Sequence, residues 1–221
     1  MAREAVLDGV RSALAGAVIP PLPRVPAATV VIDRELLGAR FTREARAVGT
    51  VVHEVAGPSA AIEVVVGILR ALPAAPRAVA WPTPLARTIA TAAVAAIPHA
   101  TLRIVDGTND AEVSANVAAA DVGLTTADYL VAESGTLVLR ADGRARSVSL
   151  LPPVHVAIVT RDRLWADLGA ALADLRAAGA RDSCVTLVTG PSRTADIEKK
   201  LVVGVHGPCA LHVVLLERGE A

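Results

Sequence analysis

The sequence predicts a mixed α/β fold, a three-layer α/β/α sandwich built around a mostly parallel sheet. Hydrophobic residues make up 53% of the 221 residues and aromatic residues only 2%, so the core consists of Ala, Val, Leu and Ile. Aliphatic cores of this kind suit parallel strands that helices cover on both faces. From Thr50 onward, short apolar runs alternate with helical patterns, which is the order that parallel sheets with crossover helices require.

The N-terminal part is predicted to stand apart from this sheet. Apolar residues recur at helical spacing between Arg3 and Leu14, and the segment Ile19-Pro20-Pro21-Leu22-Pro23 would follow as a linker. We therefore expect an N-terminal helix and Pro-rich linker in residues 1–24 and one α/β domain in residues 25–221. Such a helix would pack on the body or on another subunit, which leaves a homo-oligomer open.

Within the domain, the apolar runs predict these strands in chain order: Thr50–Val55, Arg77–Trp81, Thr101–Val105, Val122–Thr125, Thr136–Leu139, Val154–Val159, Val185–Val188 and Ala210–Leu216. The helical patterns predict these helices: Arg34–Val48, Ser59–Leu72, Thr83–Ala96, Asp110–Ala119, Asp162–Ala178 and Thr194–Val202. Ser59 is the expected N-cap of its helix, and Thr83 is the expected N-cap before Pro84. Ligands of such sheets bind beyond the carboxyl ends of the strands, where we expect the turns after Trp81, Thr125 and Val188 to meet.

Charge and hydropathy exclude several functions. The 22 basic and 22 acidic residues balance, and no concentrated basic face predicts nucleic-acid binding. The richest apolar stretch, Thr88–Leu102, is too short to span a membrane and contains Pro98 and His99. Charged residues interrupt the N-terminal apolar residues, so a signal peptide is not predicted and we expect a cytoplasmic protein.

Two cysteines, Cys184 and Cys209, lie far apart in the sequence. They cannot supply the four thiolates of an ordinary iron–sulfur cluster, and we expect buried free thiols. The sequence contains no H-x-x-x-H or H-E-x-x-H spacing, so no metal site is predicted. The glycine motifs of dinucleotide-binding folds and P-loops and the nucleophile elbow are also missing from it.

The densest group of polar and glycine residues lies between Leu187 and Pro208. A strand that ends in a glycine turn can present backbone amides to an anion, and two such turns occur here. The candidate anion-binding residues are Gly190, Pro191, Ser192, Thr194, Asp196, Glu198, Gly204 and Gly207. Turn formation and helix capping would equally explain them. His206 lies between the last two glycine positions and is the histidine that best fits a catalytic role.

A second polar group follows the predicted strand Val122–Thr125. It contributes the candidate ligand residues Thr126, Ser134, Gly135 and Thr136. Asp128 and Glu133 are its candidate catalytic residues, because a carboxylate at the edge of an apolar sheet can act as acid, base or nucleophile. Local turn chemistry would also account for Asp128 and Ser134.

Four segments together resemble a known family. They read ADVGLTTADYLVAESGTLVL, SLLPPVHVAIV, GPSRTADIE and GVHGP followed by LHVVLL, in order between Val79 and Leu216. They are similar to the LUD domain and, more narrowly, to the lactate utilization protein C family. The resemblance implies the fold of the phosphosugar isomerase and coenzyme A transferase group. Thr126-Ala127-Asp128 lies where that group often has a glycine-alanine-aspartate turn, with threonine in place of glycine.

The resemblance further implies a part in the oxidation of L-lactate to pyruvate, beside partner proteins that carry iron–sulfur clusters. Three interpretations stay open. The chain is a subunit that binds a small carboxylate or phosphate at the carboxyl edge of the sheet. Alternatively, it is a free-standing transferase or isomerase with Glu133 as nucleophile or base. In the third interpretation it is a non-catalytic scaffold that docks partner subunits.

Overall fold

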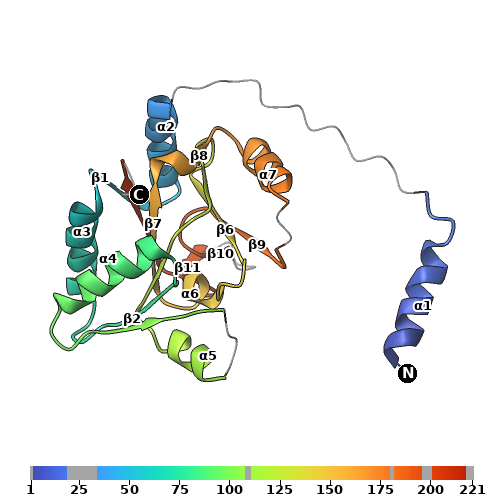
Figure 1. Ribbon diagram of the computed structural model, residues 1–221, viewed down its shortest axis with the longest axis horizontal. Coiled ribbons are helices and arrows are strands. Elements are labelled where there is room, and N and C mark those ends of the chain that lie inside the picture. The colour runs from blue at the N-terminus through green and yellow to red at the C-terminus, as the bar shows by residue number, and fades with distance from the viewer. Residues whose placement is uncertain (1, 19–33, 108–110, 180–181, 196–200, 218–221) are drawn as a thin grey trace.

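The computed structural model describes residues 2–18, 34–107, 111–179, 182–195 and 201–217 (Figure 1). The N-terminal helix α1 (Ala2–Leu14) forms as predicted, and its side chains from Arg3 onward are all exposed. The expected Pro-rich linker at Ile19–Pro23 lies outside the described residues. The second helix, α2 (Arg34–Ala47), matches its predicted range to within one residue.

A six-stranded sheet forms the centre of the fold. Its order is β1-β12-β7-β4-β2-β3, and every neighbouring pair is parallel. The strands are β1 (Val51–Val55), β2 (Arg77–Ala80), β3 (Thr101–Ile104), β4 (Val122–Thr125), β7 (Val154–Thr160) and β12 (Ala210–Leu216). The apolar runs predicted these six strands because most of their residues are buried between covering layers.

Two helices, α3 (Pro58–Arg70) and α4 (Pro84–Ala95), cover one face of this sheet. Their buried side chains, among them Leu69 and Ile89, pack on Val156, Ile158 and Val214. Both helices follow a central strand and return over the sheet. Their N-termini are therefore placed at its carboxyl edge, where the candidate site lies.

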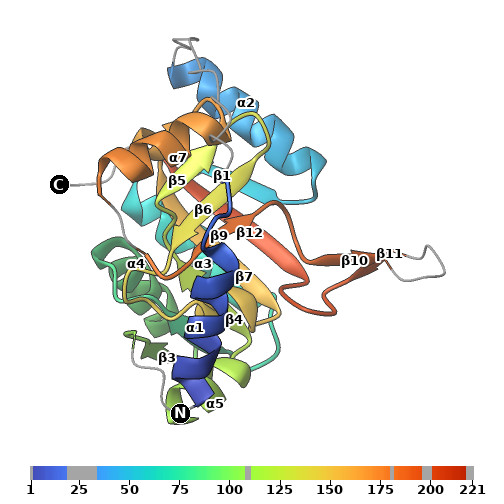
Figure 2. The same cartoon turned by 90° about the vertical axis from the view of Figure 1, so that its right-hand side faces the viewer.

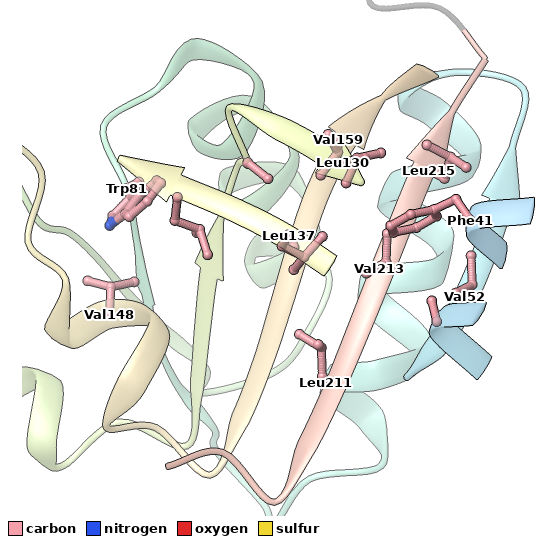
Figure 3. Close-up of a cluster of buried hydrophobic side chains, with 14 of the residues drawn as sticks. Phe41, Val52, Trp81, Leu130, Leu137, Val148, Val159, Leu211, Val213 and Leu215 are labelled. Carbon is pink, nitrogen blue, oxygen red and sulfur yellow. The ribbon is translucent and has the colours of Figure 1, made fainter. Parts of the chain in front are cut away.

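The opposite face carries a second, smaller sheet in addition to helices. Its order is β8-β5-β6-β9, from β5 (Tyr129–Val131), β6 (Thr136–Arg140), β8 (Leu164–Trp165) and β9 (Val185–Val188). Figure 3 shows Leu130 and Leu137 of this sheet over central strands that carry Val159 and Val213, with Phe41 of α2 beside them. The short helices α5 (Ala111–Ala118) and α6 (Ser147–Leu150) complete this layer, and α7 (Leu168–Ala177) packs on its outer side. The predicted mixed α/β fold with a mostly parallel central sheet is confirmed, and the small sheet is an addition to it.

Three local predictions are wrong. Gly57 is the N-cap of α3, because Pro58 takes the first helical position and moves Ser59 into the first turn. The range Asp162–Ala178 is not one helix, since a 3-10 turn at Arg161–Arg163 and strand β8 precede α7. The described ends of Thr194–Val202 are strands β10 (Arg193–Ala195) and β11 (Leu201–Val203), which pair antiparallel. Figure 2 shows this hairpin projecting from the side of the body.

Candidate functional site

A cavity of about 1070 Å³ opens at the carboxyl edge of the central sheet. The loops that follow β1, β2, β4, β7 and β12 all contribute to it, as expected for an open parallel sheet. Its polar lining consists of Glu35, Thr83, Thr88, Thr126, Asp128, Arg144, Thr160, Arg161, Asp162, Arg163 and Glu217. Two of the residues predicted from sequence, Thr126 and Asp128, are therefore cavity residues.

The N-termini of α3 and α4 both open on this cavity. Pro58 and Pro84 begin the two helices and line the cavity wall. Among the described residues, no side chain caps either helix, although Thr83 is the N-cap of α4 as predicted. The hydroxyl of Thr126 donates to that of Thr83 at 3.5 Å. First-turn amides without a capping side chain carry partial positive charge and favour an anion.

An ion pair between Asp128 and Arg144 forms another part of the wall. Arg144 Nη2 donates to both carboxylate oxygens at 2.9 Å, and the Arg140 amide donates to Asp128 Oδ2 at 2.9 Å. The Arg144 guanidinium lies 4.5 Å from the centroid of the buried Trp81 ring. Trp81 is in turn fixed because its Nε1 donates to the Ala145 carbonyl at 2.9 Å. Figure 3 places Trp81 beside Val148 at the margin of the apolar cluster.

The charges of the lining nearly cancel. The described lining includes three arginines and four carboxylates. Arg161 forms ion pairs with Glu54 and Glu217, and Arg163 pairs with Asp162. Each lining arginine is therefore paired with a carboxylate, and the lining carries no net positive charge.

The turn after Val188 does not reach this edge, so that part of the sequence prediction is wrong. Gly190 lies against Val48, which immediately precedes the amino end of β1. The Ser192 amide donates to the Pro208 carbonyl at 2.9 Å, just before β12 begins. The reason is strand direction: β9 belongs to the small sheet, where it runs antiparallel to β6, and not to the parallel central sheet.

The glycines of this region are explained by close packing. Gly190 has φ +80°, and an added Cβ would lie 2.5 Å from the Val48 carbonyl oxygen. Gly204 has φ +81°, and an added Cβ would lie within van der Waals overlap of the Cys209 thiol. The Gly204 amide donates to the Ser192 carbonyl at 2.9 Å, which joins the two predicted turns to each other. Pro191 and Gly207 lie in this same group, whereas the side chain of His206 is exposed.

The two predicted acidic residues beyond Thr194 cannot be placed. Thr194 lies in β10 of the projecting hairpin, whereas Asp196 and Glu198 lie outside the described residues. The two glycine turns themselves meet each other at the amino edge of the central sheet, whereas Asp128 and the cavity lie at the carboxyl edge.

Glu133 lies in the turn between β5 and β6, and its carboxylate caps the N-terminus of α7. Its Oε1 accepts the Leu168 amide at 3.1 Å, at the first residue of α7. In the same turn, Gly135 has φ +64°, and an added Cβ would lie 2.3 Å from the Ala45 amide nitrogen. The hydroxyls of Ser134 and Thr136 lie 2.7 Å apart, and Thr136 is 2.8 Å from Thr189. The structure therefore gives these predicted site residues local structural contacts, and it does not bring them to the cavity.

Two further polar side chains of the central sheet are histidines with lowered pKa values. Burial lowers the pKa of His155 to about 4, and its Nε2 is 2.8 Å from the Thr125 hydroxyl. Burial and the neighbouring His53 lower the pKa of His212 to about 4, and the His53 Nε2 lies 3.2 Å from His212 Nδ1. Both sites hold neutral imidazoles at neutral pH. None of these three histidines lines the cavity.

Sequence reasoning missed Arg144 and Arg161. Arg144 follows Asp142-Gly143, a sequence pattern that predicts a turn but does not indicate a ligand-binding site. Arg161 lay between the predicted strand Val154–Val159 and the predicted helix Asp162–Ala178, in neither range. Thr83 had a signal, since it follows a buried strand and precedes a helix-starting proline, and this context could have placed it in the site.

Neither a metal site nor a membrane span is found within the part of the chain that the structure describes. No group of three or more His, Cys, Asp or Glu side chains there could hold a metal ion. No helix among the same residues is long and apolar enough to cross a membrane.

The sequence is similar to several proteins named lactate utilization protein C. The one from Halalkalibacterium halodurans is 47% identical over 105 residues, 45% of this chain and 46% of that protein. The one from Macrococcus caseolyticus is 45% identical over 103 residues, 44% of this chain and 45% of that protein. The matched stretch thus spans less than half of each relative's length.

Solved structures and family models extend the comparison to most of the chain. A crystal structure of a DUF162 family protein from Deinococcus radiodurans superposes with a TM-score of 0.52 at 22% identity. The superposition covers 84% of this chain and 99% of that one, and it supports the fold. The model of the LUD domain matches residues 38–216. The chain therefore belongs to the LUD domain family.

Proposed function

We propose that this chain serves in lactate utilization and takes part in the oxidation of L-lactate to pyruvate. The observation that carries the proposal is the 45–47% identity to proteins named lactate utilization protein C. The matched stretch is under half of each protein, so the role of the whole relative is carried over here as a hypothesis. The LUD domain match over residues 38–216 is consistent with it.

Oxidation of lactate to pyruvate releases two electrons and two protons, which need an acceptor. The chain has two cysteines, Cys184 and Cys209, both free thiols, too few for the four thiolates of an ordinary cluster. The resemblance to the lactate utilization protein C family implies partners with iron–sulfur clusters, and we assign the electron-accepting groups to such partner subunits.

The ligand site of this proposal is the cavity at the carboxyl edge. Lactate and pyruvate each carry one negative charge, so their site must supply donors to an anion. The uncapped N-termini of α3 and α4 supply amides for an anion, and Arg144 supplies a guanidinium. These groups all line the same cavity, whereas Glu133 and His206 do not line it.

Growth on L-lactate tests the proposal. The chain is expressed in a Bacillus licheniformis strain that lacks its own lactate utilization protein C, a relative 42% identical over 103 residues. We expect growth on L-lactate to be restored. A folded, abundant chain that restores no growth would contradict the role in lactate utilization.

Two threonines of α4 provide a matched test of the cavity. Thr88 and Thr91 are both exposed, but only Thr88 lines the cavity. We expect Thr88→Trp to obstruct part of the cavity and to reduce growth on L-lactate, while Thr91→Trp leaves growth unchanged. Equal growth of the two variants would remove the cavity from the proposal.

A second function, as an assembly subunit, is favoured by the projecting hairpin. The exposed side chains of Val202 and Val203 in β11 retain 44% and 47% of their accessible surface, and an isolated two-stranded hairpin is marginal in water. Contact with a partner subunit would bury these side chains. If docking is the main function, Val203→Glu stops co-purification with cluster proteins while both α4 variants support normal growth.

A further inference from the structure

We propose that Arg144 recognises the carboxylate of the ligand and that Asp128 is the positioning residue that holds Arg144 in place. This inference rests on the proposed function only in taking the carboxyl-edge cavity as the ligand site. It changes the role predicted for Asp128, from a group that deprotonates the ligand to a group that orients another side chain.

The Arg144 side chain is held on two sides yet still lines the cavity. Its side chain retains 12% exposure, and that of Asp128 retains 19%. Asp128 takes one end of the guanidinium through Nη2, and the Trp81 ring lies against the guanidinium at 4.5 Å. A guanidinium that is fixed before the ligand arrives loses little conformational entropy on binding, and its positive charge attracts a carboxylate.

The backbone also fixes the position of Arg144. Asp142 has φ +30° and Gly143 has φ +71°, so the turn before Arg144 uses the left-handed region, which is uncommon for aspartate. Gly107 packs so closely on the Gly143 carbonyl that an added Cβ would overlap it. The turn is therefore pinned to the loop after β3, and Arg144 has little freedom to leave the wall.

Asp128 has the contacts of a structural anion. Its two oxygens accept from Arg144, and Oδ2 also accepts the Arg140 amide. These donors occupy lone pairs that a base would use to accept a proton from the ligand. A partly buried ion pair is a poor source of stability, because desolvation offsets most of the Coulomb attraction. We therefore assign the ion pair a role in orienting Arg144 rather than in stabilising the fold.

Trp81 reports directly on Arg144. The chain has two tryptophans, so Trp165→Phe leaves Trp81 as the sole indole and conserves the aromatic contact of residue 165 with Tyr129. We expect L-lactate to change Trp81 fluorescence in a saturable way. In this background, Arg144→Gln is expected to raise the dissociation constant at least tenfold, because the charge that pairs with the carboxylate is lost.

Two more variants separate positioning from folding. Asp128→Asn is expected to shift the Trp81 emission before ligand is added and to weaken L-lactate binding severalfold, since Arg144 loses its anchor. Arg146→Gln is the matched control, because Arg146 lies two residues away, is exposed and does not line the cavity. We expect its emission and its affinity to equal those of the parent.

The outcomes are distinct. Parent-like affinity in Arg144→Gln, with binding retained in the Trp165→Phe chain, overturns the inference and leaves the role in lactate utilization standing. A chain that restores growth but gives no lactate signal by fluorescence or calorimetry also overturns it. Tighter binding of inorganic phosphate than of L-lactate overturns the assignment to a carboxylate. Failure of the growth test with binding intact contradicts the proposed function alone.

Discussion

The Gly190→Ala substitution tests whether the glycine turns of the amino edge are structural. Gly190 has φ +80°, and its added Cβ would lie 2.5 Å from the Val48 carbonyl oxygen and 3.3 Å from the Val48 side chain. The nearest obstacle is backbone, so no side-chain rotation relieves it. Residues 48 and 190 would have to move apart where α2 leads into β1.

Two costs add at this position. An alanine in the left-handed region costs roughly 1–2 kcal/mol. Forcing a methyl group into a packed contact costs roughly 1–3 kcal/mol. Together we expect the free energy of unfolding to fall by about 2–5 kcal/mol, which lowers the melting temperature of a chain of this size by roughly 4–20 °C.

Gly179→Ala is the matched control, because Gly179 has φ +67° with no atom within 4 Å of an added Cβ. It should show the backbone cost alone, roughly 1–2 kcal/mol. Thermal and urea unfolding followed by circular dichroism measure both variants, and calorimetry with L-lactate should give parental affinity for each at 15 °C. Equal destabilisation of the two variants, or lost affinity in folded Gly190→Ala, would refute the packing explanation.

Two other perturbations test the described contacts. The pKa of His155 is lowered to about 4 by burial, so the unfolded chain takes up its proton first as pH falls from 6.5. His155 should therefore contribute a loss of up to about 3 kcal/mol of stability between pH 6.5 and 4 in urea titrations, and His155→Gln should show a shallower total drop. An unchanged slope in that variant would contradict the assignment. Asp167→Ala removes the carboxylate that accepts the Ala170 amide at 2.8 Å and should cost about 1 kcal/mol, whereas Asp167→Asn should retain most of the cap; equal losses in the two variants would argue against capping.

The central sheet was predictable because burial on both faces leaves a direct trace in the sequence. Runs such as Val154–Val159 and Ala210–Leu216 are almost wholly aliphatic, and both became central strands. Their neighbours were not predictable. β12, the last strand in the chain, lies between β1 and β7, and such long-range pairing follows from the packing of the whole domain.

The wrong elements share a cause. Leu164–Trp165 lies next to a good helical pattern, but it pairs with β5, some 30 residues earlier in the chain. Leu201–Val203 continues a helical pattern from Thr194, yet it pairs with Arg193–Ala195. In both cases a tertiary or hairpin contact overrides a modest local preference.

The same physical reason separates the site residues that were predicted from those that were misplaced or missed. Thr126 and Asp128 were predicted because they follow a buried strand of the parallel sheet at its carboxyl edge. Gly190 was misplaced because Val185–Val188 has the apolar character of a parallel strand but belongs to the antiparallel sheet. Arg144 gave no signal, because its partners Asp128 and Trp81 meet it only in space.

Amide shifts on titration with L-lactate test the central claim most directly, since a ¹⁵N-labelled chain reports on both edges of the sheet at once. We expect the largest shifts at the carboxyl edge, in Thr83, Leu85, Thr126, Asp128 and Arg144. Saturable shifts confined to the amino edge, in Gly190, Ser192, Gly204 and His206, would contradict a ligand site in the cavity.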